Sequence, residues 1–458
     1  MSDRIEKDSL GEVRVPVDAL WGAQTQRAVD NFPMSGQPMP PEFIRAVVLV
    51  KKAAAEANHR LDLLDGDRYG AITSACDRVL EGGLEDQFPV DRYQTGSGTS
   101  TNMNVNEVLA RLASSEQLEV DANDHVNMSQ SSNDVIPTAI HVSSVIALQH
   151  QVLPALTHLQ GVIYERENLL LNQVKTGRTH LMDAMPVTVG QELRTWREQF
   201  AAVGRRLEQS CEELLATPQG GTAVGTGINA DSRFAGEFAR VMHRLTGYRF
   251  RELEHKFVGI SGVDAPVNLS AQYRGLASVL MKVANDLRWM NSGPIHGLGE
   301  ISLQALQPGS SIMPGKVNPV IPEAVAMAAA QVMGLDAANA IAGQSGNFQL
   351  NVMLPLVGAN LLEMAKLLAN SAKLMGDNTI ATFTVNEATL NEAVGRNPVL
   401  VTALNPEIGY AKAAEIAKEA YASGRSIIDV AEEKSGLSRE RLEQLLNPVT
   451  LTRGGIGH

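Results

Sequence analysis

Apolar side chains recur at every third or fourth position through a long central stretch of the chain. The clearest case covers residues 186–216. Its shared face consists of Leu193, Trp196, Phe200, Val203, Leu207, Cys211 and Leu214. This spacing is typical of a single apolar stripe on an α-helix. Pro186 stands where a first-turn proline is tolerated, and a Thr-Pro-Gln-Gly-Gly run ends the segment. We therefore predict a helix of about 45 Å, because each residue adds about 1.5 Å.

Such a long helix needs partners of similar length to cover its apolar face. Residues 135–170, 268–290 and 322–343 are the candidates, and each is bounded by turn-forming or capping residues. The pattern predicts a mainly all-α fold whose centre is a bundle of long helices.

The segments on either side of this bundle are shorter. At 458 residues the chain is too long for one compact core, which predicts two or three domains or one very elongated assembly. Residues 1–130 form a mixed, mainly helical domain, residues 131–356 the bundle, and residues 357–458 a small helical domain. In the first domain we expect a short strand at 13–16 and helices near 42–60 and 67–82. In the last we expect helices at 411–422 and 437–446.

Composition narrows the class of protein. Hydrophobic residues make up 44% of the chain and charged residues 20%, and no stretch approaches the roughly 20 apolar residues of a membrane-spanning helix. The charged amino terminus lacks the apolar run of a secretory signal. We therefore expect a cytoplasmic protein without a membrane partner.

Charge and cysteine content exclude further classes. Fifty-one acidic against 39 basic residues give a net charge of −12, which argues against nucleic acid as a partner. Cys76 and Cys211 lie far apart, so neither a disulfide framework, a zinc site nor an iron–sulfur cluster is supported. We expect no metal and no cofactor.

Four polar or glycine-rich loops lie close to predicted helices, at residues 95–104, 129–134, 177–183 and 309–318. Glycine-rich loops and helix amino termini offer free backbone N–H groups to an anion. The first two loops are equally well explained as ordinary helix caps. The third contains His180, and a lone histidine is usually structural. None of these three decides the function alone.

The fourth loop, Gly309-Ser310-Ser311-Ile312-Met313-Pro314-Gly315-Lys316-Val317-Asn318, has the densest set of donors. A nucleotide-binding P-loop needs four residues before Gly-Lys and a Ser or Thr after it. Here five residues intervene and Val317 follows, so that interpretation fails. The glycine-rich run at 220–225 follows a helix instead of a strand, so a dinucleotide fingerprint is unsupported as well.

Together the four loops resemble those of the fumarase and aspartase superfamily, specifically its class II fumarate hydratases. The fourth loop is similar to the superfamily signature. The other three have the hydratase forms Gln-Thr-Gly-Ser-Gly-Thr at 94–99, Ser-Ser-Asn-Asp at 131–134 and Arg-Thr-His-Leu at 178–181. Aspartases usually have different residues at these three places. The similarity runs from residues 4–6 to residues 408–414 and so covers nearly the whole chain.

The resemblance implies an activity, an assembly and a set of site residues. The activity is reversible hydration of fumarate to L-malate, without a cofactor, in a homotetramer whose active sites each draw on three subunits. Ser310 is the implied base, His180 the acid that protonates the leaving hydroxyl, and Glu323 the carboxylate that orients His180. The implied substrate-binding residues are Ser97, Gly98, Thr99, Ser131, Ser132, Asn133, Thr179, Ser311, Lys316 and Asn318.

Two departures from the family pattern leave alternatives open. Relatives often have a histidine where Asp121 begins the segment Asp121-Ala122-Asn123-Asp124, a second dicarboxylate site in those proteins. An anion there predicts weak or absent binding. The turn at 320–323 is closer to the aspartase form, which keeps aspartate ammonia-lyase as an alternative. A noncatalytic structural or binding protein on the same fold, like the related lens crystallins, is the other alternative.

Overall fold

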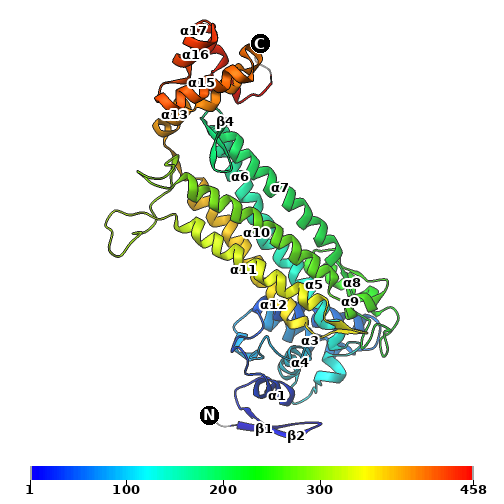
Figure 1. Cartoon of the computed structure of the whole chain (residues 1–458). Coiled ribbons are helices and arrows are strands. Elements are labelled where there is room, and N and C mark those ends of the chain that lie inside the picture. The colour runs from blue at the N-terminus through cyan, green and yellow to red at the C-terminus, as the bar shows by residue number, and fades with distance from the viewer. Residues whose placement is uncertain (1–2, 456–458) are drawn as a thin grey trace. The chain divides into compact units, whose positions relative to one another are not determined.

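The structure of the protein, a computed structural model, describes residues 3–455 and consists mainly of helices (Figure 1). In these residues the strands occur only as two-stranded sheets. This confirms the predicted mainly α-helical fold.

The α-helices are α1 (Ala23–Asn31), α2 (Pro41–Arg60), α3 (Gly66–Leu80), α4 (Thr99–Ala113), α5 (Ser132–Ala147), α6 (Leu153–Leu169), α7 (Val189–Leu214), α8 (Phe234–Thr246), α9 (Lys256–Ser261), α10 (Asp264–Met290), α11 (Val320–Gly343), α12 (Leu354–Met375), α13 (Glu387–Arg396), α14 (Asn405–Ile408), α15 (Tyr410–Ser423), α16 (Ile427–Ser435), α17 (Arg439–Leu445) and α18 (Pro448–Leu451). Short 3₁₀ and π segments are η1 (Glu85–Gln87), η2 (Ala122–Val126), η3 (Leu148–Val152), η4 (Gly376–Ile380) and η5 (Pro398–Leu404). The paired strands are β1 (Asp3–Asp8) with β2 (Gly11–Pro16), β3 (Val174–Thr179) with β4 (Met182–Thr188), β5 (Ala216–Thr217) with β6 (Arg251–Glu252), β7 (Ile301–Ser302) with β10 (Thr384–Val385), and β8 (Gly346–Asn347) with β9 (Leu350–Asn351).

The chain divides into two compact units, each made of segments that are discontinuous in sequence. The first unit holds the residues up to Pro154 together with Val203–Ala277 and Ala329–Ala369. The second unit holds Ala155–Ala202, Ser278–Ala328 and the residues from Asn370 onward. The division into three domains along the sequence stays a prediction.

In the first unit, α2 packs against α3, α5 and α8. Its apolar face, including Phe43, Val47 and Val50, is completely buried. Burying each such side chain stabilises the fold by about 1.5–3 kcal/mol. The same unit contains a buried polar contact between two helices. Ser270 of α10 donates to Asp336 of α11 over 2.7 Å.

In the second unit, the first half of α7 lies against α6. Arg197 of α7 pairs with Glu167 of α6 at 2.8 Å, and Trp196 is fully buried beneath the ammonium of Lys282, 5.6 Å from the ring centre. All seven residues of the apolar stripe identified in the sequence are buried. The helical spacing of these residues therefore predicted the buried face of α7 correctly.

The predicted start of that helix at residue 186 was wrong. Helix α7 begins at Val189, and Pro186 lies in β4, which pairs with β3 in an antiparallel hairpin. Proline is tolerated there because a two-stranded sheet leaves each strand with a free edge, where a missing N–H costs no ladder hydrogen bond.

The other long helices agree with the predicted ranges. Residues 132–169 form one helical run through α5, η3 and α6, and α10 and α11 begin within four residues of the predicted starts. Helix α12 was not predicted, and it runs across the predicted domain boundary at residue 356.

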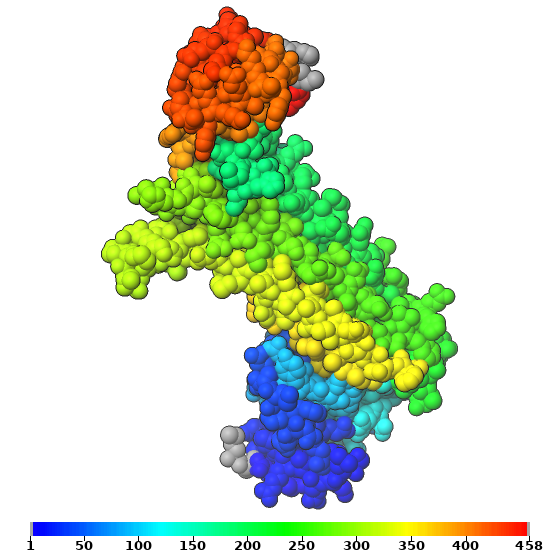
Figure 2. All heavy atoms as spheres, in the orientation of Figure 1, coloured from blue at the N-terminus to red at the C-terminus, as the bar shows by residue number. Residues whose placement is uncertain are grey.

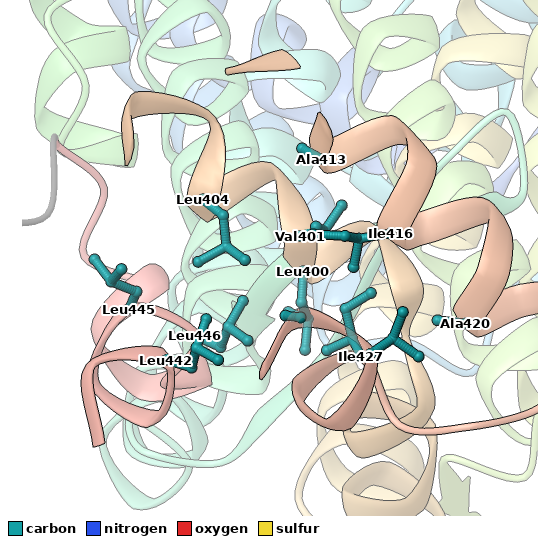
Figure 3. Packing of buried hydrophobic residues seen from close by; sticks show 12 residues of the cluster. Leu400, Val401, Leu404, Ala413, Ile416, Ala420, Ile427, Leu442, Leu445 and Leu446 are labelled. Carbon is teal, nitrogen blue, oxygen red and sulfur yellow. The ribbon is translucent and has the colours of Figure 1, made fainter. Parts of the chain in front are cut away.

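The carboxy-terminal residues of the second unit have an apolar core of their own (Figure 3). Leu404, Ile416, Val430 and Leu442 are fully buried in it. They come from η5, α15, α16 and α17, so several short helices share one cluster.

Candidate active site

The loop at residues 95–99 leads into α4 in the first unit. The side-chain oxygens of Ser97 and Thr99 lie 2.9 Å apart, within hydrogen-bonding distance. Gly98 has a left-handed backbone conformation (φ +71°), and a Cβ there would lie 2.9 Å from the side chain of Ile136. Glycine therefore lets the amino terminus of α4 approach α5 closely.

The loop at residues 129–134 caps α5 in the same unit. The Ser131 hydroxyl accepts a hydrogen bond from the backbone of Asn133, and the Ser131 backbone donates to Asp134. This is a capping box, so the loop acts as an ordinary helix cap, one of the two interpretations that the sequence allowed. The Asn133 amide donates to the backbone carbonyl of Ala223 over 2.8 Å.

Asp134 connects this helix start to the glycine-rich loop at 220–222. Its Oδ2 accepts backbone hydrogen bonds from Gly220 at 3.0 Å and Thr222 at 2.9 Å. Burial raises the pKa of Asp134 to about 6. The hydrogen bonds that the carboxylate accepts from the backbone N–H groups of Ser131, Gly220 and Thr222 oppose that rise. Asp134 thus holds two loops of the first unit together.

The proposed second dicarboxylate site lies at η2. The Asp121 carboxylate accepts backbone hydrogen bonds from Asn123 at 2.7 Å and Asp124 at 2.8 Å. It therefore occupies the two backbone donors that an external carboxylate would need at the start of this short helix. The side chains of Asn123 and Asp124 are exposed and Ala122 is half-buried.

His180 lies at the tip of the β3–β4 hairpin in the second unit. Thr179 pairs with Met182, so His180 and Leu181 form a two-residue turn. Both have positive φ, at 58° and 61°, without being glycine. Such backbone strain is uncommon and clusters at functional sites. Thr179 and His180 are exposed.

A buried ion cluster supports the base of this hairpin. The Glu300 carboxylate, only 2% exposed, pairs with Lys175 at 2.7 Å and Arg178 at 2.8 Å. Lys175 also pairs with Glu192 at 2.9 Å. A cavity of about 650 Å³ is lined by His180 together with Lys175, Arg178 and Trp289.

The Ser310 loop lies between α10 and α11 and extends away from the helices (Figure 1). The Ser310 hydroxyl oxygen accepts backbone hydrogen bonds from Ile312 at 3.2 Å and Met313 at 3.0 Å. Ser311 is exposed. The loop is closed at its base, where the Gly309 backbone donates to the Lys316 carbonyl and the Asn318 amide donates to the Gly309 carbonyl. A Cβ at Gly309 would lie 2.5 Å from the Lys316 carbonyl oxygen, so only glycine fits.

Lys316, Asn318 and Glu323 share one cavity of about 440 Å³. Glu323 lies in the first turn of α11, where a carboxylate also interacts favourably with the helix dipole. Lys316 is exposed, and within residues 3–455 we find no acidic side chain paired with it. Its ammonium is therefore available to an external anion.

The candidate residues are distributed over both units of the chain. Ser97–Thr99 and Ser131–Asn133 belong to the first unit, whereas Thr179, His180, Ser310, Ser311, Lys316, Asn318 and Glu323 belong to the second. Within the second unit, His180 lines one cavity, and Glu323 lines another with Lys316.

Three buried charged residues behind these loops, Lys51, Lys175 and Glu300, were not predicted from the sequence. Each lies in or beside a segment that looks like an ordinary helix or loop, so no local residue pattern indicates a buried charge. In the part of the chain that the structure describes, no three His, Cys, Asp or Glu side chains are grouped as metal ligands would be.

Comparisons with known proteins agree over the full length. A family model described as lyase matches residues 11–334, and one described as the fumarase C carboxy terminus matches residues 400–453. The chain is 58% identical to a protein named fumarate hydratase class II 2 from Pseudomonas aeruginosa, with 99% of both sequences aligned. It is 55% identical to the fumarate hydratase class II of Xylella fastidiosa, covering 99% of this chain and 96% of the relative.

Solved structures that are similar to this chain also include a class II fumarase and a fumarate lyase. The class II fumarase of Schistosoma mansoni has a TM-score of 0.96 at 36% identity, covering 98% of this chain and 99% of the other. A fumarate lyase:delta crystallin from Brucella melitensis, bound to cobalt, has a TM-score of 0.94 at 40% identity, covering 98% and 100%. The chain therefore belongs to the lyase family, in the branch formed by the class II fumarate hydratases.

Proposed function

We propose that this protein catalyses the reversible hydration of fumarate to L-malate. The relatives that share 55–58% of its residues are named for this activity, and the similarity extends over 99% of the chain. The candidate loops also have the residues that elimination of water requires, a potential base, a potential acid and a cation for the carboxylate.

The observation that supports this mechanism most directly is the surroundings of Ser310. In the dehydration direction, Ser310 as alkoxide takes a proton from the carbon next to a carboxylate of malate. A serine alkoxide is too basic to persist in water unless donors stabilise it. The Ile312 and Met313 N–H groups already point at this oxygen and need no reorganisation to stabilise its negative charge.

The electron pair left by that proton moves into the carboxylate and gives a doubly charged enolate-like intermediate. The unpaired Lys316 ammonium is suited to stabilise this charge, with Asn318 beside it. His180, protonated and oriented by Glu323, then donates a proton to the departing hydroxyl, so that water and fumarate are released. Ser310 and His180 return to their starting protonation states by exchange with solvent.

The neutral side chains would hold the other carboxylate without adding charge. Hydroxyl and amide groups of Ser97, Thr99, Ser131, Ser132, Asn133, Thr179 and Ser311 can donate hydrogen bonds to it. Gly98 lies between two of these residues, and its own N–H donates to the Thr95 carbonyl. Local donors of this kind compensate for the net charge of −12, which repels a dianion at long range.

We further propose a homotetramer in which three subunits contribute to each active site. Helix α11 supports this. It has a mean hydropathy of 1.3 and the length of a membrane span, yet only 28% of its most apolar window is buried. Figure 2 shows residues of this helix, in yellow, on the face in view. Burial against other copies would remove this apolar surface from water. The long run of residues 132–169 has a similar hydropathy of 1.2, but 61% of its window is buried inside the chain.

The activity is tested by incubating the purified protein separately with L-malate and with L-aspartate and following the ultraviolet absorbance of fumarate. We expect fumarate from malate alone. Fumarate from aspartate would favour the ammonia-lyase alternative, and no fumarate from either would favour a noncatalytic protein.

The role of Ser310 is tested with Ser310→Ala. We expect kcat for malate dehydration to fall by about 10²–10⁴-fold, the usual contribution of a general base, with the oligomeric mass unchanged. Near-normal turnover would rule out Ser310 as the base.

A further inference from the structure

A lysine is completely buried in the first unit, in the middle of α2. Lys51 has no exposed surface, although the adjacent Lys52 reaches the protein surface and pairs with Asp77. The Lys51 ammonium donates to the side-chain oxygens of Asn127 at 2.8 Å and Gln130 at 3.0 Å. Both acceptors lie in the segment that leads into α5, immediately before Ser131.

Asn127 extends this contact toward the candidate active site. Its Oδ1 also accepts hydrogen bonds from Asn102 at 3.2 Å and Asn106 at 3.1 Å, both on α4. The Asn102 amide donates in addition to the Ser132 hydroxyl over 3.1 Å. A continuous chain of hydrogen bonds therefore leads from the Lys51 ammonium through Asn127 and Asn102 to Ser132.

The direction of these hydrogen bonds determines whether the Ser132 hydroxyl can donate to a ligand. A hydroxyl has one hydrogen to donate and an oxygen that accepts. Because Asn102 donates to the Ser132 oxygen, the hydroxyl hydrogen is left for another acceptor. An ionised carboxylate accepts and cannot donate, so the arrangement favours a carboxylate ligand at this position.

The chain also joins two of the loops that carry candidate substrate-binding residues. Asn102 lies in the first turn of α4, just after Ser97–Thr99, and Ser132 is the first residue of α5. The positive ends of two helix dipoles are thereby held next to one another, an arrangement that favours an anion between them.

Burying this ammonium is energetically expensive. The loss of water lowers the pKa of Lys51 to about 7, and the nearby Asp134 carboxylate and the Cys76 thiol act in the opposite direction. Helix packing does not require such a cost, because an apolar side chain of similar volume usually packs as stably. The buried charge is therefore better explained by a role in binding.

We propose that Lys51 is a positioning residue for the dicarboxylate substrate, acting through Asn127 and Asn102 to fix Ser132 as a hydrogen-bond donor. This inference rests on the proposed function, in which Ser132 binds a substrate carboxylate. Lys51 itself does not touch the substrate.

The test compares Lys51→Met and Lys51→Gln with the matched control Lys52→Met, which removes the same charge from the adjacent position. Both Lys51 variants should raise KM for malate about tenfold, the usual effect of one lost hydrogen bond to a charged group, with a smaller effect on kcat. The Lys52 variant should leave both constants unchanged. Folded Lys51 variants with the KM of the unmodified protein would overturn the proposal.

A double-mutant cycle with Ser132→Ala separates positioning from general loss of structure. If Lys51 acts through Ser132, combining Lys51→Met with Ser132→Ala should raise KM no further than Ser132→Ala alone. Additive effects would contradict the proposal. If neither Lys51 variant gives folded protein, Asn102→Ala interrupts the same chain without removing a charge, and it must raise KM similarly.

The cycle also distinguishes this inference from the proposed function on which it depends. Ser132→Ala with unchanged KM would remove Ser132 from the substrate site and overturn the inference, while the measured turnover of malate would leave the proposed function standing. Ser132→Ala with raised KM, beside Lys51 variants with unchanged KM, would overturn only the role of Lys51.

Discussion

At the scale of single residues, hydrogen bonds from neighbouring donors limit what the side-chain oxygens of Ser310, Ser132 and Asp121 can do. The Ser310 oxygen receives two backbone donors, and the Ser132 oxygen receives one from Asn102. The Asp121 carboxylate accepts two backbone donors of its own helix. In the proposed mechanism the first two contacts prepare Ser310 and Ser132 for substrate, whereas the third leaves the Asn123 and Asp124 N–H groups occupied.

Asp121 provides a direct prediction about the second dicarboxylate site. Asp121→His removes the carboxylate that occupies the Asn123 and Asp124 N–H groups and adds a cationic group below about pH 6.5. We expect malate soaked into crystals of this variant to be visible at η2. The unmodified protein, soaked in parallel, should show none, and equal occupancy in both would disprove the blocking role of Asp121.

His141 provides a prediction about stability and pH. It is buried in α5, and one ring nitrogen lies 3.0 Å from the Leu214 carbonyl. Burial lowers its pKa to about 4, although the hydrogen bond to Leu214 opposes this. Because the folded pKa lies below the unfolded value of about 6.5, the contribution to stability is complete above pH 6.5 and is lost as pH falls toward 4.

His141→Gln keeps a side-chain amide near Leu214 but does not titrate. Between pH 7 and pH 5 the unmodified protein should lose about 2 kcal/mol more stability than this variant. The measurement is the thermal unfolding midpoint of both proteins at the two pH values. Parallel changes in the two midpoints would show that His141 is not the titrating group.

At the scale of secondary-structure elements, several long helices could be predicted, whereas α12 and the β3–β4 hairpin were not. Trp196 and Phe200 repeat at helical spacing because one face of α7 is buried, so the sequence reveals the element. Two-residue hairpin turns usually contain Asn-Gly or a similar pair. Here the turn is His180-Leu181, both with positive φ, and nothing in those residue types indicates a turn.

The hairpin that carries His180 should depend on Glu300. Glu300→Gln takes the shared carboxylate from the buried Lys175 and the partly exposed Arg178, and breaking a buried pair costs about 3–5 kcal/mol. We expect a lower unfolding midpoint and a kcat for malate reduced about tenfold or more, as the hairpin loses its fixed position. The measurements are thermal unfolding and initial rates.

Glu192→Gln is the matched control for this substitution. Glu192 pairs with the same Lys175, but its side chain is 27% exposed, so water can replace the lost contact. It should have a clearly smaller effect on both quantities. Equal effects of the two variants would mean that the buried position of Glu300 is unimportant.

At the scale of the whole molecule, the sequence motifs predict which residues form the site, but they do not predict how those residues assemble. His180 and Glu323 line separate cavities of the second unit, and the serine-rich loops of α4 and α5 belong to the first. No helical period or loop motif specifies which copy of the chain supplies a residue. The exposed apolar surface of α11 is the feature that indicates other copies.

Met327 on α11 tests whether this surface is an interface between copies. Its side chain is 69% exposed in the single chain. Met327→Glu should be tolerated by the chain itself but would bury a carboxylate in the proposed interface, which is strongly unfavourable. We expect smaller particles in light scattering and loss of malate dehydration. A variant with unchanged mass and activity would exclude α11 from the interface.

The most direct test of the composite active site is complementation between two inactive variants. Ser310→Ala and His180→Asn tetramers are dissociated, mixed in equal amounts and allowed to reassociate, and malate dehydration is measured. If Ser310 and His180 of one site come from different subunits, about a quarter of the sites receive both intact residues, and about a quarter of the unmodified activity returns. If both residues come from the same chain, every site keeps one defect, and a mixture as inactive as its components would contradict the account.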